Sequence, residues 1–367
     1  MRLSIIHLRS SSGLYGAEQV VLELCRQQSV HYPATRLLVF APGGAPGGAL
    51  LSMARSRDIE ASALACRGPL DFSCIARLRR LLRADISTHR VILHCHDYKS
   101  VVYGGLAAIG LPVARVATLH GWLDDSRRLR LYHWLEARML RHFQRVCAVS
   151  EAIFQRLIKL GLEPGMVRRV DNGIDTLRFR PRARAVDAPA ADVVLLGTAA
   201  RLSPEKNLGL LIRTLAELRD RGRIMHLVIV GEGPERAALQ GLIRQLDLSA
   251  QVAMPGAVSG LEAWYPTLDA FVLPSLKEGM PLSVLEALAC GCPVIASATG
   301  AIPELLDGVP GCRTVLPGDA GTLLAALLAL PEKGRPLLAA RERVERCYSA
   351  ESMATRYSGI YREAILS

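Results

Sequence analysis

The sequence of 367 residues predicts an α/β protein with two doubly wound, Rossmann-like domains that face each other across a cleft. Short β-branched and aliphatic runs alternate with longer segments of helical period almost from end to end, which is typical of parallel strands joined by crossover helices. The alternation breaks around residues 178–192, where Arg, Pro and Ala follow one another without an apolar period. Domains usually hold about 100 to 200 residues, so two domains fit this length.

The first half contains seven runs with the pattern of buried strands. We expect strands at residues 3–8, 36–40, 59–64, 91–96, 113–120, 146–150 and 167–170. Helical periods fill the gaps, for example at residues 17–28 and 127–141. The break that follows has the composition of a linker.

After the linker the alternation starts again. We expect strands at residues 193–198, 226–230, 252–254, 270–273, 294–297 and 314–316. We therefore place the N-terminal domain at residues 1–180 and the C-terminal domain at residues 181–349. The helical segment 352–366 either caps the second domain or returns to the first.

Composition excludes several classes of protein. Half of the residues are apolar and 22% are charged, which excludes collagen-like and disordered chains. No apolar run approaches the ~20 residues that a membrane-spanning helix needs, and residues 3–8 are too short for a secretory signal, so we expect a cytoplasmic location. The nine cysteines are odd in number and lack a Cys-x-x-Cys motif, so we expect most of them, including Cys290 and Cys292, to be small core residues.

The positive charge is concentrated in the first half. Residues 1–180 hold 26 Lys and Arg against 14 Asp and Glu, whereas residues 181–367 hold 19 against 20. A basic domain attracts an anionic substrate, an anionic bilayer or nucleic acid, although scattered solubilising charge would give the same count. Aromatic residues form only 5% of the chain and no nucleic-acid-binding motif accompanies the arginines, so we expect no nucleic acid partner.

Segment 269–306 carries the most informative motif. A strand ends near Pro274, Glu278 lies in the following loop, and Pro281 suits the first turn of a helix that reaches about residue 289. Glu286 then lies in the second turn. The backbone N–H groups of Leu282, Ser283 and their neighbours would favour a phosphate at the helix start. Two carboxylates around an anion site suggest a nucleotide sugar, with Glu286 on the ribose diol; the alternative is a solvent-facing helix glutamate.

A pair of cations follows the first strand of the second domain. Arg201 comes directly after that strand and Lys206 lies close to the next helix. Two cations on such a loop can clamp a diphosphate and stabilise the charge that grows on a departing nucleoside diphosphate. Exposed loop charges are the alternative.

In the first half, a glycine-containing loop joins the first strand to its helix. Gly13 and Gly16 allow a ligand to approach the backbone, and the helix that starts near Ala17 would point its N-terminus at it. A tight turn without a ligand explains the same glycines. The spacing is not the Gly-x-Gly-x-x-Gly of a nicotinamide site.

Histidines occupy two other strand ends. His94 and His96, before Asp97, project to the same face of a strand, but no further histidine or cysteine is spaced to complete a metal site. We therefore expect packing or hydrogen-bond contacts there, and no metal. His120, at the end of the next strand, is placed to contact a substrate hydroxyl, or else is a satisfied core histidine.

Together these motifs resemble a known family: the sequence is similar to the retaining glycosyltransferases of family 4 (group 1), which have the GT-B fold. The resemblance covers nearly the whole chain and is strongest at Pro274-Ser275-x-x-x-Glu278-Gly279-x-Pro281 through Glu286-Ala287, at Gly291-x-Pro293-Val294 and at Gly300-x-x-Pro303-Glu304. Further similar segments are the pair Arg201 and Lys206, Gly16-Ala17-Glu18, Thr118-x-His120-Gly121 and Asn172-Gly173-Ile174-Asp175. Tyr15 and Ala200 stand where the family often has glycine.

The resemblance implies a hexosyl transfer from a nucleoside diphosphate sugar to an acceptor hydroxyl, in cell-surface polysaccharide or glycolipid assembly. Glu278, with Gly279, would contact the donor sugar and Glu286 the ribose. Arg201 and Lys206 would neutralise the leaving diphosphate, so that no metal or other cofactor is needed. Gly16, Leu282 and Ser283 would complete the donor site, and His120 would bond to the donor sugar near the reacting carbon. Asp97 and His120 would lie on the acceptor side. Residues 350–367 would cross back and join the N-terminal, acceptor-binding domain.

Segment 127–145 alternates arginines with Leu, Trp and Met. It could lie on an anionic bilayer, at the inner face of the plasma membrane, and meet a lipid-linked saccharide; an internal crossover helix is equally consistent with the pattern.

Three other functions fit parts of the pattern. A nucleotide-sugar epimerase would keep the fold, but it needs an acid and a base for sugar C–H chemistry that the sequence does not reveal. A non-catalytic scaffold would bind nucleotide sugars without needing both cations. A nicotinamide dehydrogenase lacks its glycine motif here.

Overall fold

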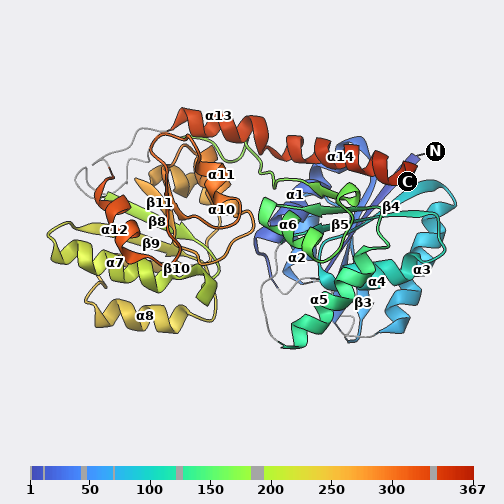
Figure 1. Cartoon of the computed structure of the whole chain (residues 1–367), viewed down its shortest axis with the longest axis horizontal. Coiled ribbons are helices and arrows are strands. Elements are labelled where there is room, and N and C mark those ends of the chain that lie inside the picture. The colour runs from blue at the N-terminus through green and yellow to red at the C-terminus, as the bar shows by residue number, and fades with distance from the viewer. Residues whose placement is uncertain are drawn as a thin grey trace. The chain divides into compact units, whose positions relative to one another are not determined.

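The computed structural model describes residues 2–10, 13–42, 48–68, 71–120, 127–182, 194–330 and 337–367. The chain divides into two compact units, one formed by Met1–Gly173 with Ala350–Ser367 and the other by Ile174–Ser349 (Figure 1). The first unit thus ends before the boundary expected at residue 180. Most of the expected linker, residues 183–193, lies outside the described residues.

The N-terminal unit is built on a parallel sheet of seven strands in the order β3-β2-β1-β4-β5-β6-β7. The strands are β1 (Arg2–Ser10), β2 (Ala34–Pro42), β3 (Ala61–Cys66), β4 (His89–Cys95), β5 (Val113–Leu119), β6 (Arg145–Ala148) and β7 (Val167–Arg169). Every strand expected in this half is present. The central strands are buried along most of their length, which explains why they read as continuous apolar runs.

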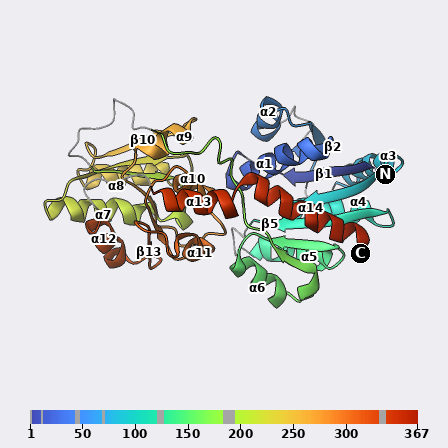
Figure 2. The same ribbon diagram turned by 90° about the horizontal axis from the view of Figure 1, so that it is seen from above.

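Helices connect these strands and cover the sheet. They are α1 (Gly16–His31), α2 (Ala49–Ser56), α3 (Phe72–Ile86), α4 (Tyr98–Ala108), α5 (Arg127–Leu140) and α6 (Glu151–Lys159), with a short 3₁₀ turn η1 (Pro164–Met166). The C-terminal helix α14 (Ala350–Leu366) also belongs to this unit, where it lies along α1 and β5 (Figure 2). Its tyrosines Tyr357 and Tyr361 are buried under the sheet.

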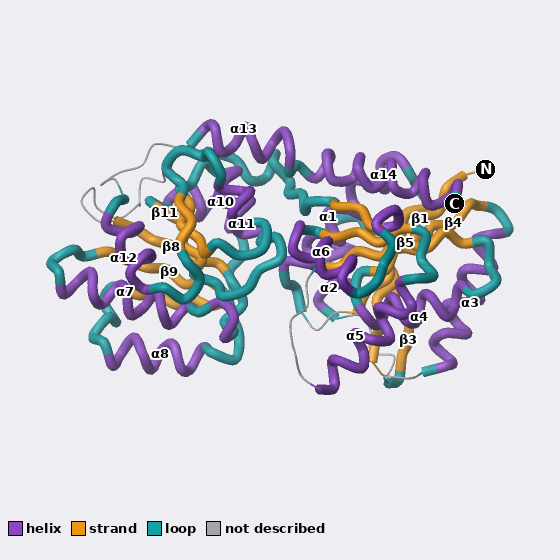
Figure 3. The backbone as a smooth tube through the Cα atoms, viewed as in Figure 1, coloured by secondary structure: helices purple, strands orange, loops and turns teal. Residues whose placement is uncertain are grey.

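The C-terminal unit repeats the design with a parallel sheet of six strands in the order β10-β9-β8-β11-β12-β13. The strands are β8 (Val194–Ala199), β9 (Met225–Val230), β10 (Val252–Gly256), β11 (Ala270–Leu273), β12 (Val294–Ser297) and β13 (Arg313–Val315). The helices are α7 (Leu208–Asp220), α8 (Arg236–Gln245), α9 (Leu261–Trp264), α10 (Leu282–Ala289), α11 (Ile302–Leu306), α12 (Ala320–Leu328) and α13 (Leu338–Cys347), with 3₁₀ turns η2 (Pro204–Lys206) and η3 (Tyr265–Thr267). Helices and connecting loops surround the strands in both units (Figure 3).

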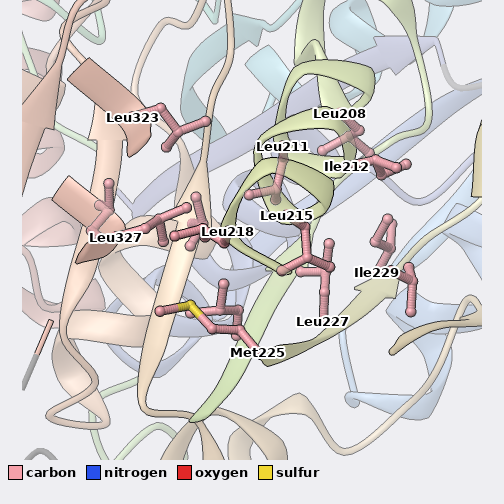
Figure 4. Close-up of a cluster of buried hydrophobic side chains, with 14 of the residues drawn as sticks. Leu208, Leu211, Ile212, Leu215, Leu218, Met225, Leu227, Ile229, Leu323 and Leu327 are labelled. Carbon is pink, nitrogen blue, oxygen red and sulfur yellow. The ribbon is translucent and has the colours of Figure 1, made fainter. Parts of the chain in front are cut away.

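The core of the C-terminal unit joins α7 and α12 to the sheet. Leu211 and Leu215 of α7 face Leu227 of β9, and Leu323 and Leu327 of α12 close the other side (Figure 4). These side chains are at most 1% exposed. Burying each leucine contributes about 1.5 to 3 kcal/mol to folding, so this core fixes the strands whose ends carry the site.

The nine cysteines are free thiols, and seven of them, including Cys290 and Cys292, are buried, as the sequence predicts. None of the helices within the described ranges is long and apolar enough to cross a bilayer.

Strand order reverses between β1 and β4 in the first unit and between β8 and β11 in the second. Parallel α/β sheets bind ligands at such reversals, beyond the carboxyl ends of the strands, because the connecting helices leave on opposite faces there. The expected site residues follow these strands or their neighbours.

Candidate active site

Glu278 and Lys206 form an ion pair in the C-terminal unit. Nζ of Lys206 lies 2.6 Å from Oε1 of Glu278, and the hydroxyl of Ser275 donates to the same oxygen at 2.6 Å. The two charged side chains are only 18% and 7% exposed. In such a pair the carboxylate can accept hydrogen bonds from hydroxyl groups of a ligand, while the ammonium can donate to anionic oxygens of the same ligand.

Arg201 lies in the loop that follows β8, on the same turn as Lys206. Both cations act on Glu205, which accepts a hydrogen bond of 2.6 Å from Ser203. Burial raises the pKa of the Glu205 carboxyl, but the Ser203 hydroxyl and the charges of Lys206 and Arg201 outweigh it and lower the pKa overall. The two expected cations therefore share one small region.

Two glycines that follow β9, Gly231 and Gly233, hold this loop. A Cβ on Gly231 would collide with the carbonyl of Ala200, and one on Gly233 would collide with Leu202. The close approach allows the amide of Ala200 to donate to the carbonyl of Val230 at the end of β9, and the amide of Leu202 to donate to the carbonyl of Glu232, at 3.0 Å each. Pro234 lies in the turn before α8, which begins at Arg236. The Gly-x-Gly spacing after a strand was the available signal.

Glu286 lies in the second turn of α10, as expected, and is half-buried. The hydroxyl of Tyr265 donates to its Oε2 at 2.7 Å. Burial raises the pKa of the Glu286 carboxyl, while the Tyr265 hydrogen bond and the charge of Arg178 oppose that rise. Tyr265 thus holds one carboxylate oxygen of Glu286, the residue that is expected to bind the ribose. No pattern in the sequence indicated Tyr265, because it comes from a separate 3₁₀ turn.

The start of α10 has the character expected of an anion site. Pro281 is the N-cap residue rather than part of the first turn, and it contributes no side-chain hydrogen bond, so it leaves the amides of Leu282 and Ser283 uncapped by its side chain. Gly279, in the preceding loop, accepts a hydrogen bond of 2.8 Å from the amide of Ala301. Gly300 has a φ of +56° and no room for a Cβ against Gly279, so this glycine holds the Glu278 loop.

In the N-terminal unit, Gly16 is the first residue of α1, and Glu18 locks the loop before it. Oε1 of Glu18 accepts from Arg9 at 2.7 and 3.0 Å, and its Oε2 accepts from the amide of Tyr15 at 3.1 Å. Gly13 makes room for the ring of Tyr15. Residues 13–15 are thus held against the start of α1, with Tyr15 where the resemblance leads one to expect glycine.

Asp97 caps α4 and ties it to β1. Oδ1 accepts from the amide of Ser100 at 2.9 Å, and Oδ2 accepts from the amide of Ser10 at 2.6 Å. Both oxygens thus have partners within the chain. The acceptor-side contact remains a prediction.

The expected histidines form a buried cluster with a member that the sequence analysis missed. His94 and His96 lie on one face with ring centroids 4.0 Å apart, and His7 of β1 joins them because it is in register with His94. Ring nitrogens of these three lie within 4.8 Å of one another, so the third ligand that seemed absent does exist. Hydrogen bonds to Gln28, Tyr361 and Thr118 and between the rings already engage these nitrogens. His120, at the end of β5, contacts His96.

Two family models match this chain. The model described as Glycosyltransferase Family 4 covers residues 15–178, and the one described as Glycosyl transferases group 1 covers residues 193–333. The D-inositol 3-phosphate glycosyltransferase of Saccharomonospora viridis is 31% identical over 303 residues, which are 75% of this chain and 70% of the relative. The chain belongs to glycosyltransferase family 4. The resemblance seen in the motifs is thereby confirmed.

Other glycosyltransferases are similar over shorter or longer stretches. The putative colanic acid biosynthesis glycosyltransferase WcaL of Escherichia coli is 30% identical over 67% of this chain, and the match spans 64% of the relative. For WcaL of Salmonella typhimurium the corresponding share is 56%, so the chain spans less than two thirds of both relatives. The putative glycosyltransferase EpsF of Bacillus subtilis is 28% identical over 85% of this chain and 83% of its own length.

Solved structures show the same fold at lower identity. Anabaena HepE, crystallised in complex with UDP-glucose, superposes with a TM-score of 0.83 at 18% identity, over 98% of this chain and 99% of HepE. Sucrose-phosphate synthase from Thermosynechococcus elongatus gives a TM-score of 0.77 at 22% identity, over 98% of each chain. The fold of this family 4 member is therefore GT-B, as predicted.

Proposed function

We propose that this family 4 protein is an enzyme that transfers a hexosyl group from a nucleoside diphosphate sugar to an acceptor hydroxyl, with retention at the anomeric carbon. The observation that carries the proposal is the Lys206–Glu278 pair at the β8/β11 strand reversal. Open α/β sheets bind ligands at such a reversal, so a cation and a carboxylate there support a ligand with both hydroxyl groups and negative charge. The complex of HepE with UDP-glucose supports a nucleotide sugar as the donor.

Each donor-site residue has a proposed task. Glu286, held by Tyr265, accepts bonds from the ribose hydroxyls, and Glu278 accepts bonds from hydroxyls of the sugar. Arg201, Lys206 and the start of α10 neutralise the diphosphate. These fixed positive groups stabilise the leaving diphosphate most strongly as its charge grows, so a divalent cation is not required.

The N-terminal unit would hold the acceptor, because the excess positive charge of the chain lies in its first half. Names of relatives refer to colanic acid, and this supports a saccharide acceptor in polysaccharide assembly. His120 would contact a sugar hydroxyl near the reacting carbon. Asp97 would act on the acceptor side through the Ser10 loop that it holds.

We also propose that α5 brings the protein to an anionic membrane surface on the cytoplasmic side. Its Trp134 is 58% exposed and lies under the Arg138 guanidinium at 5.9 Å, while Met139 packs into α4 at Gly105. One face of the helix is thus internal and another presents an aromatic residue beside a cation. Sedimentation with anionic vesicles at low and high salt tests this: wild type should bind at low salt and Trp134→Ala less well. No binding at low salt contradicts the membrane contact.

A thermal-shift screen against nucleotide sugars tests the donor site. A ligand at 100 times its dissociation constant adds about 2.7 kcal/mol to stability, and this gain should disappear in Glu286→Ala. Product analysis then separates the alternatives: a changed sugar from donor alone indicates an epimerase, and binding without hydrolysis or transfer indicates a scaffold. Stabilisation by none of the nucleotide sugars would contradict the proposal.

A further inference from the structure

A series of hydrogen bonds runs through the core of the N-terminal unit from Gln28 to His120. Oε1 of Gln28 lies 2.8 Å from Nε2 of His7, and Nδ1 of His7 lies 2.9 Å from Nε2 of His96. Nδ1 of His96 lies 3.4 Å from Nε2 of His120. Gln28, His7 and His96 are at most 2% exposed, so water does not compete for these bonds.

The imidazoles in this series are neutral at physiological pH. Burial lowers the pKa of His7 to about 4, and burial together with the charge of Arg9 lowers the pKa of His120 to about 3. Burial also lowers the pKa of His96 well below its usual value. A neutral imidazole carries one ring proton, so one nitrogen donates and the other accepts.

This constraint passes along the series from its first member. The carbonyl oxygen of Gln28 only accepts, so Nε2 of His7 carries the proton and Nδ1 of His7 accepts. Nε2 of His96 must then donate and Nδ1 of His96 must accept. Nε2 of His120 donates to that nitrogen, which leaves Nδ1 of His120 as a bare acceptor.

A second branch uses the same orientation of the Gln28 amide. Nε2 of Gln28 donates to the hydroxyl of Tyr361 at 3.1 Å, and that hydroxyl donates its own hydrogen bond to Nδ1 of His94 at 2.7 Å. Nε2 of His94 then donates to the hydroxyl of Thr118 at 2.7 Å. Each donor in this branch meets an acceptor.

Nδ1 of His120 is buried and has no hydrogen-bond partner among the residues that the structure describes. A buried acceptor without a partner destabilises the protein, and a ligand that supplies a donor would remove that cost. We propose that Gln28, His7 and His96 are positioning residues that hold His120 in its Nε2-protonated form, so that its Nδ1 accepts a hydrogen bond from a hydroxyl of a bound sugar. This inference rests on the proposed function, in which His120 meets a sugar.

Nitrogen NMR of the full-length protein labelled with ¹⁵N-histidine tests the protonation directly, without any activity. The signals of His120, assigned by their loss in His120→Gln, should show a protonated Nε2 and a bare Nδ1 at neutral pH. The reverse orientation of the Gln28 amide would invert every bond in the series. A protonated Nδ1 on His120 would therefore overturn the inference.

Kinetics test the consequence. Gln28→Leu should lower kcat/KM about tenfold, the effect of losing one hydrogen bond, whereas Gln28→Glu, which keeps an acceptor for His7, should restore most of it. Tyr357→Phe is the matched control, because it removes a buried hydroxyl contact to Thr118 outside the series. Separate variation of donor and acceptor shows which sugar supplies the hydroxyl.

A double variant separates positioning from packing. In a His120→Ala background, Gln28→Leu should cause no further loss of kcat/KM, because the nitrogen that it orients is gone. The same tenfold loss in that background would overturn the inference. A wild type that transfers no sugar would contradict the proposed function and leave the NMR result as the test of protonation.

Discussion

Nζ of Lys206 and Oε1 of Glu278 lie 2.6 Å apart, although 72 positions separate the two residues in the chain. The first prediction concerns this pair and Arg201. Lys206→Ala and Arg201→Ala should each lower kcat by roughly 10² to 10³, as expected when one fixed charge is removed from a developing anion. Steady-state kinetics with the nucleotide sugar found in the thermal screen measures the effect.

Lys277→Ala is the matched control, because Lys277 carries the same positive charge as Lys206, lies next to Glu278 in the chain and is exposed. It should retain nearly full turnover. Near-normal turnover in both Lys206→Ala and Arg201→Ala would remove the cationic clamp from the mechanism.

The second prediction concerns the ribose contact. Tyr265→Phe removes the hydroxyl that stabilises the Glu286 carboxylate, so the pKa of Glu286 should rise further above its usual value. Nucleotide binding should then weaken, and more so as the pH falls, because more of the carboxyl is protonated. Titration calorimetry across pH measures both effects.

Tyr103→Phe provides the comparison, since Tyr103, like Tyr265, is a buried tyrosine with a hydrogen-bonded hydroxyl. Its hydroxyl accepts from the backbone amide of Asp71 at 2.8 Å and lies in the other unit. Its pH profile of binding should match wild type. A profile unchanged in Tyr265→Phe as well would show that Glu286 does not bind the nucleotide.

The third prediction concerns the glycine that holds the Glu278 loop. Gly300→Ala introduces a Cβ against the backbone of Glu278 and Gly279 at a φ of +56°, and should cost about 3 kcal/mol of unfolding free energy. It should also raise the KM for the donor. Urea denaturation and kinetics measure the two effects.

Gly308→Ala isolates the backbone contribution, because Gly308 has a φ of +64° but nothing within 4 Å of its Cβ position. It should cost only about 1 kcal/mol and leave KM unchanged. Equal losses of stability in the two variants would mean that the Glu278 loop shifts to accommodate the added methyl group at no further cost.

The fourth prediction concerns stability and pH. His7 has a pKa of about 4 and His120 of about 3 in the folded chain, against 6.5 in the unfolded chain. Between pH 6.5 and 4 the histidines are therefore protonated in the unfolded chain but not in the folded chain. Their contribution to the free energy of unfolding is complete above pH 6.5 and is lost as the pH falls. Each histidine contributes up to about 1.4 kcal/mol per pH unit. Urea denaturation from pH 7.5 to 5 should show this slope, His7→Gln should reduce it, and a flat profile would show that the histidines titrate normally.

The central strands were predictable because they are buried on both faces, which turns a sheet position into a continuous apolar run. Glu278 and Glu286 were visible for a related reason, since both follow one strand and share one loop and helix. The pairing of each glutamate with its partner was not visible. Lys206 reaches Glu278 across a strand reversal, and Tyr265 approaches Glu286 from a short 3₁₀ turn, so neither pair leaves a local spacing in the chain.

The histidine cluster shows the same limit in the first unit. Sequence spacing identified His94 and His96 as neighbours on one strand, but His7 joins them through the pairing of β1 with β4. Knowledge of the strand order would have revealed it. The role of Gly231 and Gly233 could not be predicted for the same reason, because their close contact with the Arg201 loop depends on the pairing of β8 with β9.

The place of α14 has a consequence for biosynthesis. Residues 350–367 complete the unit that begins at the N-terminus, and Tyr361 fills a position beneath His94. A nascent chain emerging from the ribosome therefore exposes an unfinished first sheet throughout translation of the second unit. Messages that terminate early would yield a product in which the side chains beneath α14 are exposed, a ready target for chaperones and proteases.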